Sequence, residues 1–482
     1  MEQTPDLKHL KKQTVFSTLS LFFQSGYSAF LGLAANFILT ILLTPKIFGI
    51  YFTLLSINSL MNYFSDIGLA ASLIQKKEIT ADDIKTTFTI QQLLVIATVL
   101  IAFSLTSFII SFYRLPPEGV YLYWAILLSF FLSSLKTIPS ILLERKIQFH
   151  KIVLVQVIEN TIFYATVSIL AIMHFNLQSF TYATLLRAAV GVVIIYVISF
   201  WMPQLGVSRK SIKELLSFGL PFQASSFLAL FKDDLIILYL GRVIGFEGLG
   251  YVGWAKKWAE APIRIIMDNI SRVLFPVFSR IQHNKEKISQ LMEKVLQYQT
   301  AILAPAVFGS ALTMRVLITL IPRYGKWAPA LPLFYLFCIS ALLSTYSTPF
   351  INLFNALGKV KISLSFMAAW TIATWLLTTF LTSLYGIYGF PLTQVILAST
   401  FVLVIWQAKK LISFSFWRSV YKSLVSALGM AAVIFYSLSI FARTSAGILL
   451  AVGAGILTYY LILRFIFQID LIREVRSLFI YE

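Results

Sequence analysis

Residues 248–272 read "GLGYVGWAKKWAEAPIRIIMDNISR" and combine two patterns that point to different kinds of protein. The first six residues match GxGxxG, the pattern of dinucleotide-binding loops. Such a loop requires a strand before the glycines and a βαβ unit around them. The preceding residues, "DDLIILYLGRVIGFE" (233–247), are instead the end of a long apolar segment. We therefore interpret the glycines as a tight turn and a close helix contact, and not as a nucleotide site.

The second pattern is a series of charged residues at a spacing of four: Lys256, Glu260, Arg264, Asp268 and Arg272. On an α-helix this spacing drifts by about 40° per step, so the charges spiral over one broad face. One interpretation is an interfacial amphipathic helix with i,i+4 ion pairs. The other is a membrane-crossing helix whose charged face lines a hydrated cavity. The segment lies between a turn at 242–250 and a basic loop at 280–294, which favours the crossing helix. Pro262 predicts a kink in it.

The composition indicates an integral membrane protein. The chain has 482 residues, of which 58% are hydrophobic and 12% charged, whereas soluble domains carry about 25% charged residues. No polar stretch is long enough to fold alone. Cys338 is the only cysteine and the four histidines are scattered, which excludes an intramolecular disulfide and indicates no His-rich metal cluster. No P-loop, HExxH, GxSxG or DxD motif is present, and Asp82–Asp83 predict a helix start after Thr80. We expect no cofactor.

Apolar blocks separated by short polar or Gly/Pro-containing breaks predict an all-α polytopic membrane protein with about fourteen transmembrane helices. Their approximate limits are 17–43, 47–74, 87–113, 120–143, 152–174, 178–202, 214–240, 249–279, 295–321, 328–356, 361–384, 387–408, 419–441 and 445–467. With both termini in the cytoplasm, 25 basic residues fall in inside segments and 6 in outside loops. Since this split follows the positive-inside rule, it accounts for most of the basic charge without nucleic acid.

Two similar segments predict two halves. "LLTPKIFGIYFTLLSINSLMNYFSDIGLAASLIQ" (42–75) and "GFEGLGYVGWAKKWAEAPIRIIMDNISRVLFP" (245–276) align when Gly49 is placed on Gly250, at an offset of 201 residues. An even number of spans per repeat gives a parallel repeat, with the transport site between the halves. We expect two pseudo-symmetric six-helix bundles around a central cavity. The predicted parts are an N-terminal bundle 1–202, a cytoplasmic linker 203–213, a C-terminal bundle 214–412, and two additional spans with a cytoplasmic tail 413–482.

Away from their ends, the predicted spans contain 8 basic and 6 acidic residues. A charge at mid-bilayer costs about 2.5–3.5 kcal/mol, so these residues must pair, reach the interface or line a watery cavity. A mildly cationic interior suits an anionic ligand, because Lys and Arg are natural phosphate binders. The candidate substrate-binding residues are Arg264, Lys256, Lys257, Arg187, Lys232, Lys136, Asn58, Asn62 and Asn36. The candidates for ion coupling or charge balance are Glu260, Asp268, Asp233, Asp234, Asp66 and Glu159. For each alone, a structural ion pair stays an open alternative.

The chain also resembles a known family. The segments that carry the resemblance are "LLTPKIFGIYFTLLSI", "FSDIGLAASLIQKKEI", "IPSILLERKIQFHKI", "LLSFGLPF", "GLGYVGWA" and "VLFPVFSRIQ", in this order over residues 10–430. They resemble the bacterial polysaccharide-transport proteins, the O-antigen and exopolysaccharide flippases of the multidrug/oligosaccharidyl-lipid/polysaccharide superfamily. The resemblance implies two bundles facing a central cavity in the bacterial inner membrane. It also implies a substrate, an undecaprenyl-diphosphate-linked oligosaccharide that is turned from the inner to the outer leaflet.

We therefore hypothesise that the protein is a transporter and not an enzyme, and that it works by alternating access. The diphosphate would meet Arg264, Lys256 and either Arg187 or Lys232, and H+ or Na+ would be the coupling ion. The expected partners are the lipid-linked oligosaccharide, membrane lipid and the polysaccharide polymerase machinery, for a monomeric protein that binds no nucleic acid. Two alternatives remain. A cation-coupled multidrug exporter of the same superfamily should prefer an acidic cavity, and a membrane polymerase or ligase should carry a long outside loop.

Overall fold

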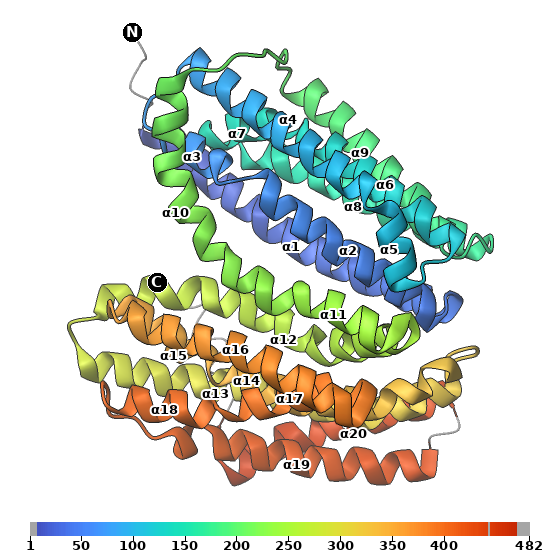
Figure 1. Cartoon of the computed structure of the whole chain (residues 1–482). Helices are drawn as coiled ribbons and strands as arrows, with labels where there is room; N and C mark the ends of the chain where they lie inside the picture. Colours follow the sequence, from blue (N-terminus) through green and yellow to red (C-terminus); the bar gives the residue numbers. More distant parts are fainter. Residues whose placement is uncertain (1–6, 442–443, 470–482) are drawn as a thin grey trace. The chain divides into compact units, whose positions relative to one another are not determined.

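The computed structural model describes residues 7–441 and 444–469. All regular elements in these ranges are helices, and Figure 1 shows coiled ribbons throughout, which confirms the predicted all-α class. The chain divides into two compact units, Met1–Gly250 and Tyr251–Glu482, and each unit is described by itself. The four parts expected from the sequence stay a prediction.

The N-terminal unit contains eleven complete helices within its described residues. They are α1 (Leu7–Leu42), α2 (Pro45–Ser65), α3 (Leu69–Gln75), α4 (Ala81–Ser104), α5 (Thr106–Tyr113), α6 (Pro117–Ser134), α7 (Thr137–Arg145), α8 (Phe149–Ile172), α9 (Gln178–Ile198), α10 (Arg209–Asp233) and α11 (Leu235–Val243). A further helix, α12 (Gly245–Ile281), begins in this unit and continues into the second.

The C-terminal unit continues with α13 (Lys285–Leu320), η1 (Gly325–Ala330), α14 (Leu331–Thr345), α15 (Thr348–Ala356), α16 (Val360–Tyr385), η2 (Gly386–Tyr388), α17 (Gly389–Ser399), α18 (Phe401–Lys409), α19 (Phe416–Phe441), α20 (Ser445–Leu461) and η3 (Ile462–Ile466). The described residues of this unit include two clusters of buried apolar side chains. One surrounds Phe278, Phe350 and Phe354, and the other surrounds Met430 and Ile434. The helices of this unit are therefore held together by packed aliphatic and aromatic side chains.

Helix starts follow the local sequence. The Thr80 hydroxyl accepts a hydrogen bond from the Asp83 main-chain N–H at 3.2 Å, and the Asp83 carboxylate accepts one from the Thr80 N–H at 2.9 Å. This capping box satisfies two otherwise unpaired donors at the start of α4, which confirms the predicted helix start. Pro45 and Pro117 occupy first positions of α2 and α6, where the missing N–H costs no helical hydrogen bond.

Among the described residues, eleven segments are long and apolar enough to cross a membrane. They are Leu19–Leu42, Pro45–Ser65, Ala81–Ser104, Pro117–Arg145, Phe149–Ile172, Gln178–Ile198, Lys285–Leu320, Gly325–Ala356, Val360–Lys409, Phe416–Phe441 and Ala446–Ile466. Many large apolar side chains on them are exposed, among them Val197 at 80% and Leu449 at 74%. A protein surface of this kind is suited to lipid. The chain is thus a polytopic membrane protein.

The count of eleven is smaller than the fourteen expected spans for identifiable reasons. Expected spans 361–384 and 387–408 both fall inside Val360–Lys409, where the short η2 separates α16 from α17. Expected spans 214–240 and 249–279 correspond to α10–α11 and to α12. These are helical but lie outside the eleven, and α12 carries the series of charges.

Polar side chains join α1 to α8 along their contact. Gln24 Nε2 donates to Gln156 Oε1 at 2.7 Å, the Tyr27 and Thr161 hydroxyls lie 2.8 Å apart, and Asn160 Nδ2 donates to the Ser28 hydroxyl at 3.1 Å. Such interhelical hydrogen bonds supplement packing where lipid supplies no hydrophobic drive between helices.

The GxGxxG residues lie in the first turns of α12, which confirms the helix-contact interpretation. Gly245 has φ of 71°, a left-handed conformation that glycine adopts without steric cost. A Cβ atom at Gly250 would overlap the Pro45 carbonyl oxygen of α2. The helix continues through Pro262 and Pro276 to Ile281, so the predicted kink does not end it.

Candidate functional site

Two adjoining cavities lie inside the N-terminal unit. The larger has a volume of about 540 Å³ and is lined by Ser59, Asn62, Tyr63, Ser65, Asp66, Gln91, Phe130, Ser133, Ser134, Thr137, Gln223, Leu230, Asp233 and Asp234. The smaller has a volume of about 240 Å³ and is lined by Tyr51, Leu55, Asn58, Asn62, Ile126, Ser129, Phe130, Ser133, Lys136, Glu159, Phe163, Thr184, Arg187 and Ala188. Because Asn62, Phe130 and Ser133 belong to both walls, the cavities are neighbours. Most of their polar groups are hydroxyls and amides.

Lys136 and Glu159 form an ion pair in the wall of the smaller cavity. Lys136 lies at the break between α6 and α7, and its Nζ donates to Glu159 Oε1 of α8. Glu159 is 5% exposed. Its carboxylate occupies the space over Gly191 of α9, where a Cβ atom would overlap it. The structure therefore brings these two candidates together as mutual charge balance, the alternative that the sequence left open.

Arg187 is the cation of the smaller cavity whose charge is not balanced by a neighbouring acid. The residue is exposed, and its guanidinium lies 5.6 Å from the centroid of the Phe163 ring. It forms no ion pair with a carboxylate in the described part of the chain. A cation–π contact leaves the planar N–H fork able to bind an anion.

Acidic residues outnumber basic ones in these two cavities, whereas the cationic interior was expected between the two halves of the chain and stays a prediction. Their walls contain two bases, Lys136 and Arg187, and four acids, Asp66, Glu159, Asp233 and Asp234. The expectation counted every intramembrane charge together, whereas the basic residues of α12 line neither cavity. Asp66 accepts a hydrogen bond from the Ala70 N–H at 3.4 Å, and Asp233 lies 4.0 Å from Lys232 Nζ. The positive charge that no carboxylate balances in these two cavities therefore lies at Arg187.

The charged series of α12 is internally paired over its first three members. Glu260 lies 3.9 Å from Lys256 Nζ and 3.0 Å from the Arg264 guanidinium, both at the i,i+4 spacing. Lys256 Nζ also lies 5.5 Å from the centroid of the Phe390 ring. The Arg264 side chain is 70% exposed. Exposed i,i+4 pairs of this kind contribute about 0.3–0.5 kcal/mol each. Of the other members, Lys257 is half-buried, while the side chains of Asp268 and Arg272 lie outside the described residues.

The asparagine candidates separate into two groups. Asn58 and Asn62 of α2 lie on the cavity walls, and Asn62 Nδ2 donates to the Asn58 carbonyl at 2.8 Å. Asn36 is buried in α1 and is absent from both linings. Two of the three candidate asparagines thus lie on the cavity walls.

The sequence analysis missed the uncharged polar residues of α4, α6 and α10. Gln91 is 6% exposed and lines the larger cavity, with Nε2 donating to the Thr137 hydroxyl at 3.0 Å. Gln223 Nε2 donates to the Tyr63 carbonyl at 3.0 Å. The signal that could have found Gln91 is the adjacent pair of glutamines in an otherwise apolar span, since buried amides need partners.

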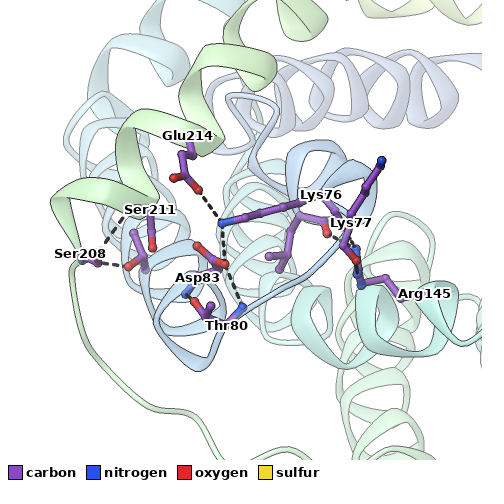
Figure 2. A network of polar contacts seen from close by, with 10 residues as sticks. Lys76, Lys77, Thr80, Asp83, Arg145, Ser208, Ser211 and Glu214 are labelled. Atoms are coloured by element: carbon purple, nitrogen blue, oxygen red, sulfur yellow. Dashed lines mark hydrogen bonds and ion pairs between the residues drawn. The ribbon is translucent and has the colours of Figure 1, made fainter. Parts of the chain in front are cut away.

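A polar network joins the segments on which the family resemblance depends. In Figure 2, Lys76 Nζ lies between two carboxylates, 2.8 Å from Asp83 and 2.7 Å from Glu214. The hydrogen bonds that Lys76 donates, to Asp83 first and then to Glu214, raise the pKa of Lys76. Glu214 begins the "LLSFGLPF" region on α10, so the lysine connects the α3–α4 loop to α10.

Arg145 closes the other side of this network (Figure 2). Its guanidinium donates to four main-chain carbonyls at the end of α3, those of Leu73, Ile74, Lys76 and Lys77, over 2.5–2.9 Å. The last carbonyls of a helix have no intrahelical partners; Arg145 satisfies two of them here, those of Leu73 and Ile74, and two more in the segment that follows α3. Lys76, Lys77 and Arg145 of these motifs therefore stabilise the structure near the helix ends and line neither cavity, whereas Asp66 of the same motifs lies on the wall of the larger one.

A family model described as "Polysaccharide biosynthesis protein" matches residues 38–332, more than half of the chain. The chain is 27% identical over 341 residues to the lipopolysaccharide biosynthesis protein WzxC of Escherichia coli (strain K12), covering 70% of this chain and 68% of that protein. It is 25% identical over 221 residues to the succinoglycan biosynthesis transport protein ExoT of Rhizobium meliloti (strain 1021), covering 45% of this chain and 44% of that protein.

Solved structures share the fold. The lipid II flippase MurJ in an inward closed conformation matches with a TM-score of 0.74 at 14% identity, over 94% of this chain and 99% of that one. A multidrug resistance MATE family transporter in an inward-facing conformation matches with a TM-score of 0.63 at 14% identity, over 78% and 94%. These relatives and neighbours are transport proteins and flippases, so this chain is a transporter and not an enzyme. It belongs to the polysaccharide biosynthesis protein family of membrane transporters, with a MurJ- and MATE-like fold.

Proposed function

We propose that the protein is a flippase that moves an undecaprenyl-diphosphate-linked oligosaccharide from the inner to the outer leaflet of a bacterial inner membrane. The observation that carries the proposal is Arg187, a cation without a carboxylate partner in the described chain, on the wall of a cavity rich in hydroxyls and amides. Diphosphate oxygens are strong acceptors for a guanidinium fork, and hydroxyls and amides suit sugar hydroxyls. Family membership and the fold support the same class of substrate.

The proposed transporter has fourteen membrane-spanning segments. Three would come in addition to the eleven apolar segments: α10–α11, α12, and a second crossing within Val360–Lys409. The proposed arrangement has two six-helix bundles and two C-terminal helices, with both termini in the cytoplasm. In this arrangement, rocking of the bundles would expose the site to each side in turn. The lipid tail would stay in the bilayer. A monomer would deliver its product to the polysaccharide polymerase machinery.

Charge compensation accompanies the proposed cycle. The diphosphate would meet Arg187 first, because Glu159 already balances Lys136. Arg264 would supply a second cation by leaving Glu260. The carboxylates Asp66, Asp233 and Asp234 of the larger cavity would take the coupling H+ or Na+.

A second candidate function is cation-coupled multidrug export. The specific observation in its favour is the excess of four acids over two bases in the two cavities, since carboxylates attract cationic drugs. Arg187 at the smaller cavity opposes it.

A leaflet-sidedness assay in proteoliposomes tests the proposal. The substrate is an undecaprenyl-diphosphate-linked oligosaccharide, and the comparison is Arg187→Ala against Arg242→Ala. Arg242 is a matched control because its guanidinium also lies over a ring, 5.1 Å from Phe112, but lines neither cavity. Loss of charge-assisted bonds worth about 1.5–3 kcal/mol predicts a roughly 10- to 100-fold slower flip for Arg187→Ala only. Equal rates for wild type and both variants, or transport of a cationic dye alone, contradict the proposal.

A further inference from the structure

Gln91 lines the larger cavity and contains a polar atom without a hydrogen-bond partner in the described structure. Gln91 Oε1 is buried and accepts no hydrogen bond within the described structure, while the other end of the same amide donates to Thr137. An unpaired buried acceptor costs about 1–3 kcal/mol, and native structures leave few of them. An unpaired acceptor on a residue of the wall is suited to a donor that arrives with a ligand, once the amide turns toward the cavity.

The neighbouring wall groups also favour a donor-rich ligand. Asp66 and Asp233 contribute carboxylates, which only accept hydrogen bonds when ionised. Asn62 is exposed, and it belongs to both cavities. The larger cavity therefore offers more acceptors than donors. A sugar ring presents several hydroxyl donors at once, and its hydroxyl oxygens can accept from the Asn62 and Gln223 amides.

The two cavities differ in what they can bind. The smaller contains Arg187, the group for an anion, and the larger contains Gln91 and the carboxylates. Since Asn62, Phe130 and Ser133 are common to both, one ligand could extend from one cavity into the other. A glycosyl diphosphate has this pattern, with an anionic group joined directly to a ring of hydroxyls.

We propose that the larger cavity is a sugar subsite, in which Gln91 Oε1 accepts a hydrogen bond from a hydroxyl of the sugar attached to the diphosphate. The assignment rests on the proposed flippase function and extends it, because it names a residue that reads the sugar and not the phosphate. Gln91 then distinguishes lipids by the sugar that they carry. Arg187 binds the diphosphate whether or not a sugar is attached.

The test compares two lipids on the purified full-length protein in nanodiscs. The probes are undecaprenyl diphosphate and undecaprenyl-diphosphate-glucose, and native mass spectrometry gives a Kd for each. The ratio of the two Kd values is the gain from the sugar. For Gln91→Met we expect the gain to fall by up to tenfold, the equivalent of one buried hydrogen bond, with the Kd for undecaprenyl diphosphate unchanged.

Gln92→Met is the matched control. Gln92 is the next residue of α4 and is also buried, but its amide exchanges hydrogen bonds with the Ser134 hydroxyl at 3.1 and 3.2 Å and it lines neither cavity. This variant loses an interhelical contact of the same type and should keep the wild-type gain. Asn62→Ala, a truncation of an exposed side chain, is a second test should Gln91→Met not fold, and it too should lower the gain.

The outcomes separate the two proposals. A wild-type gain in folded Gln91→Met, or in Asn62→Ala when the first variant does not fold, overturns the sugar subsite and leaves the flippase proposal intact. Binding of neither lipid by the wild-type protein overturns both. A lower gain in Gln91→Met with the wild-type gain in Gln92→Met supports the subsite.

Discussion

Gly49 of α2 packs against the main-chain carbonyl of Phe246 at the start of α12, with no space for a Cβ atom between them. The reciprocal contact joins Gly250 of α12 to the carbonyl of Pro45 in α2. Residues 45 and 246, like 49 and 250, are separated by 201 positions. Each glycine therefore contacts the residue four positions before its counterpart in the other segment.

Gly49→Ala should destabilise the protein strongly. The added methyl group meets a backbone oxygen, which cannot move aside as a flexible side chain can. Overpacking of this kind typically costs about 1–3 kcal/mol, and we expect the upper end of this range. The measurement is the apparent Tm in detergent, with Gly250→Ala expected to behave alike. Gly26→Ala, in α1 with nothing within 4 Å, is the control and should leave the Tm unchanged or raise it. Equal Tm values for Gly26→Ala and Gly49→Ala would contradict the close contact between Gly49 and the Phe246 carbonyl.

The helix class and the close glycine contact of α12 could be predicted because both depend on local signals. Apolar runs, the start at Thr80 and the glycine spacing are local in sequence. The balance of charges over the whole chain was a poorer guide to the charge of a cavity, because ion pairing decides which charges remain unbalanced. Glu159 cancels Lys136 across 23 positions and Glu260 is paired on both sides, and composition cannot show such partners. Gln91 was missed since its importance depends on which atoms of other helices face it.

The ion pair of Lys136 and Glu159 predicts a double-mutant cycle with strong coupling. Glu159→Gln leaves Lys136 without its counter-charge in a largely buried site, and removal of one partner of such a pair costs up to about 3–5 kcal/mol. The double variant Lys136→Met/Glu159→Gln removes both charges and should regain most of the lost Tm. Gly191→Ala should act like Glu159→Gln because its methyl group displaces the carboxylate. Additive effects of the two single substitutions would show that the pair does not form.

Lys76 predicts a pH dependence of stability on the alkaline side. Its pKa in the folded protein is raised from 10.5 by Asp83 and Glu214. A raised pKa of a base means that the folded state binds the proton more tightly, so the stabilisation is fully present below pH 10.5 and disappears as pH rises through the folded value. The Tm difference between wild type and Lys76→Met should therefore be constant from pH 7 to 9 and shrink above pH 10.5. The lysine is partly exposed and screened by salt, so the difference should also fall at high ionic strength. A difference that grows with pH would contradict this assignment.

Gln299 of α13 predicts a stabilising substitution. Its side chain is 0% exposed, and neither its Oε1 nor its Nε2 has a hydrogen-bond partner within the described residues. A buried amide without partners costs about 1–3 kcal/mol, whereas a methionine of similar length fills the space without that cost. Gln299→Met should therefore raise the apparent Tm. Gln92→Met provides the opposite case, because the Gln92 amide is satisfied by Ser134 and its loss should lower the Tm. A lower Tm for Gln299→Met would mean that the amide binds a buried water molecule, since polar buried sites retain such waters, and crystallography of the wild-type protein would then locate it.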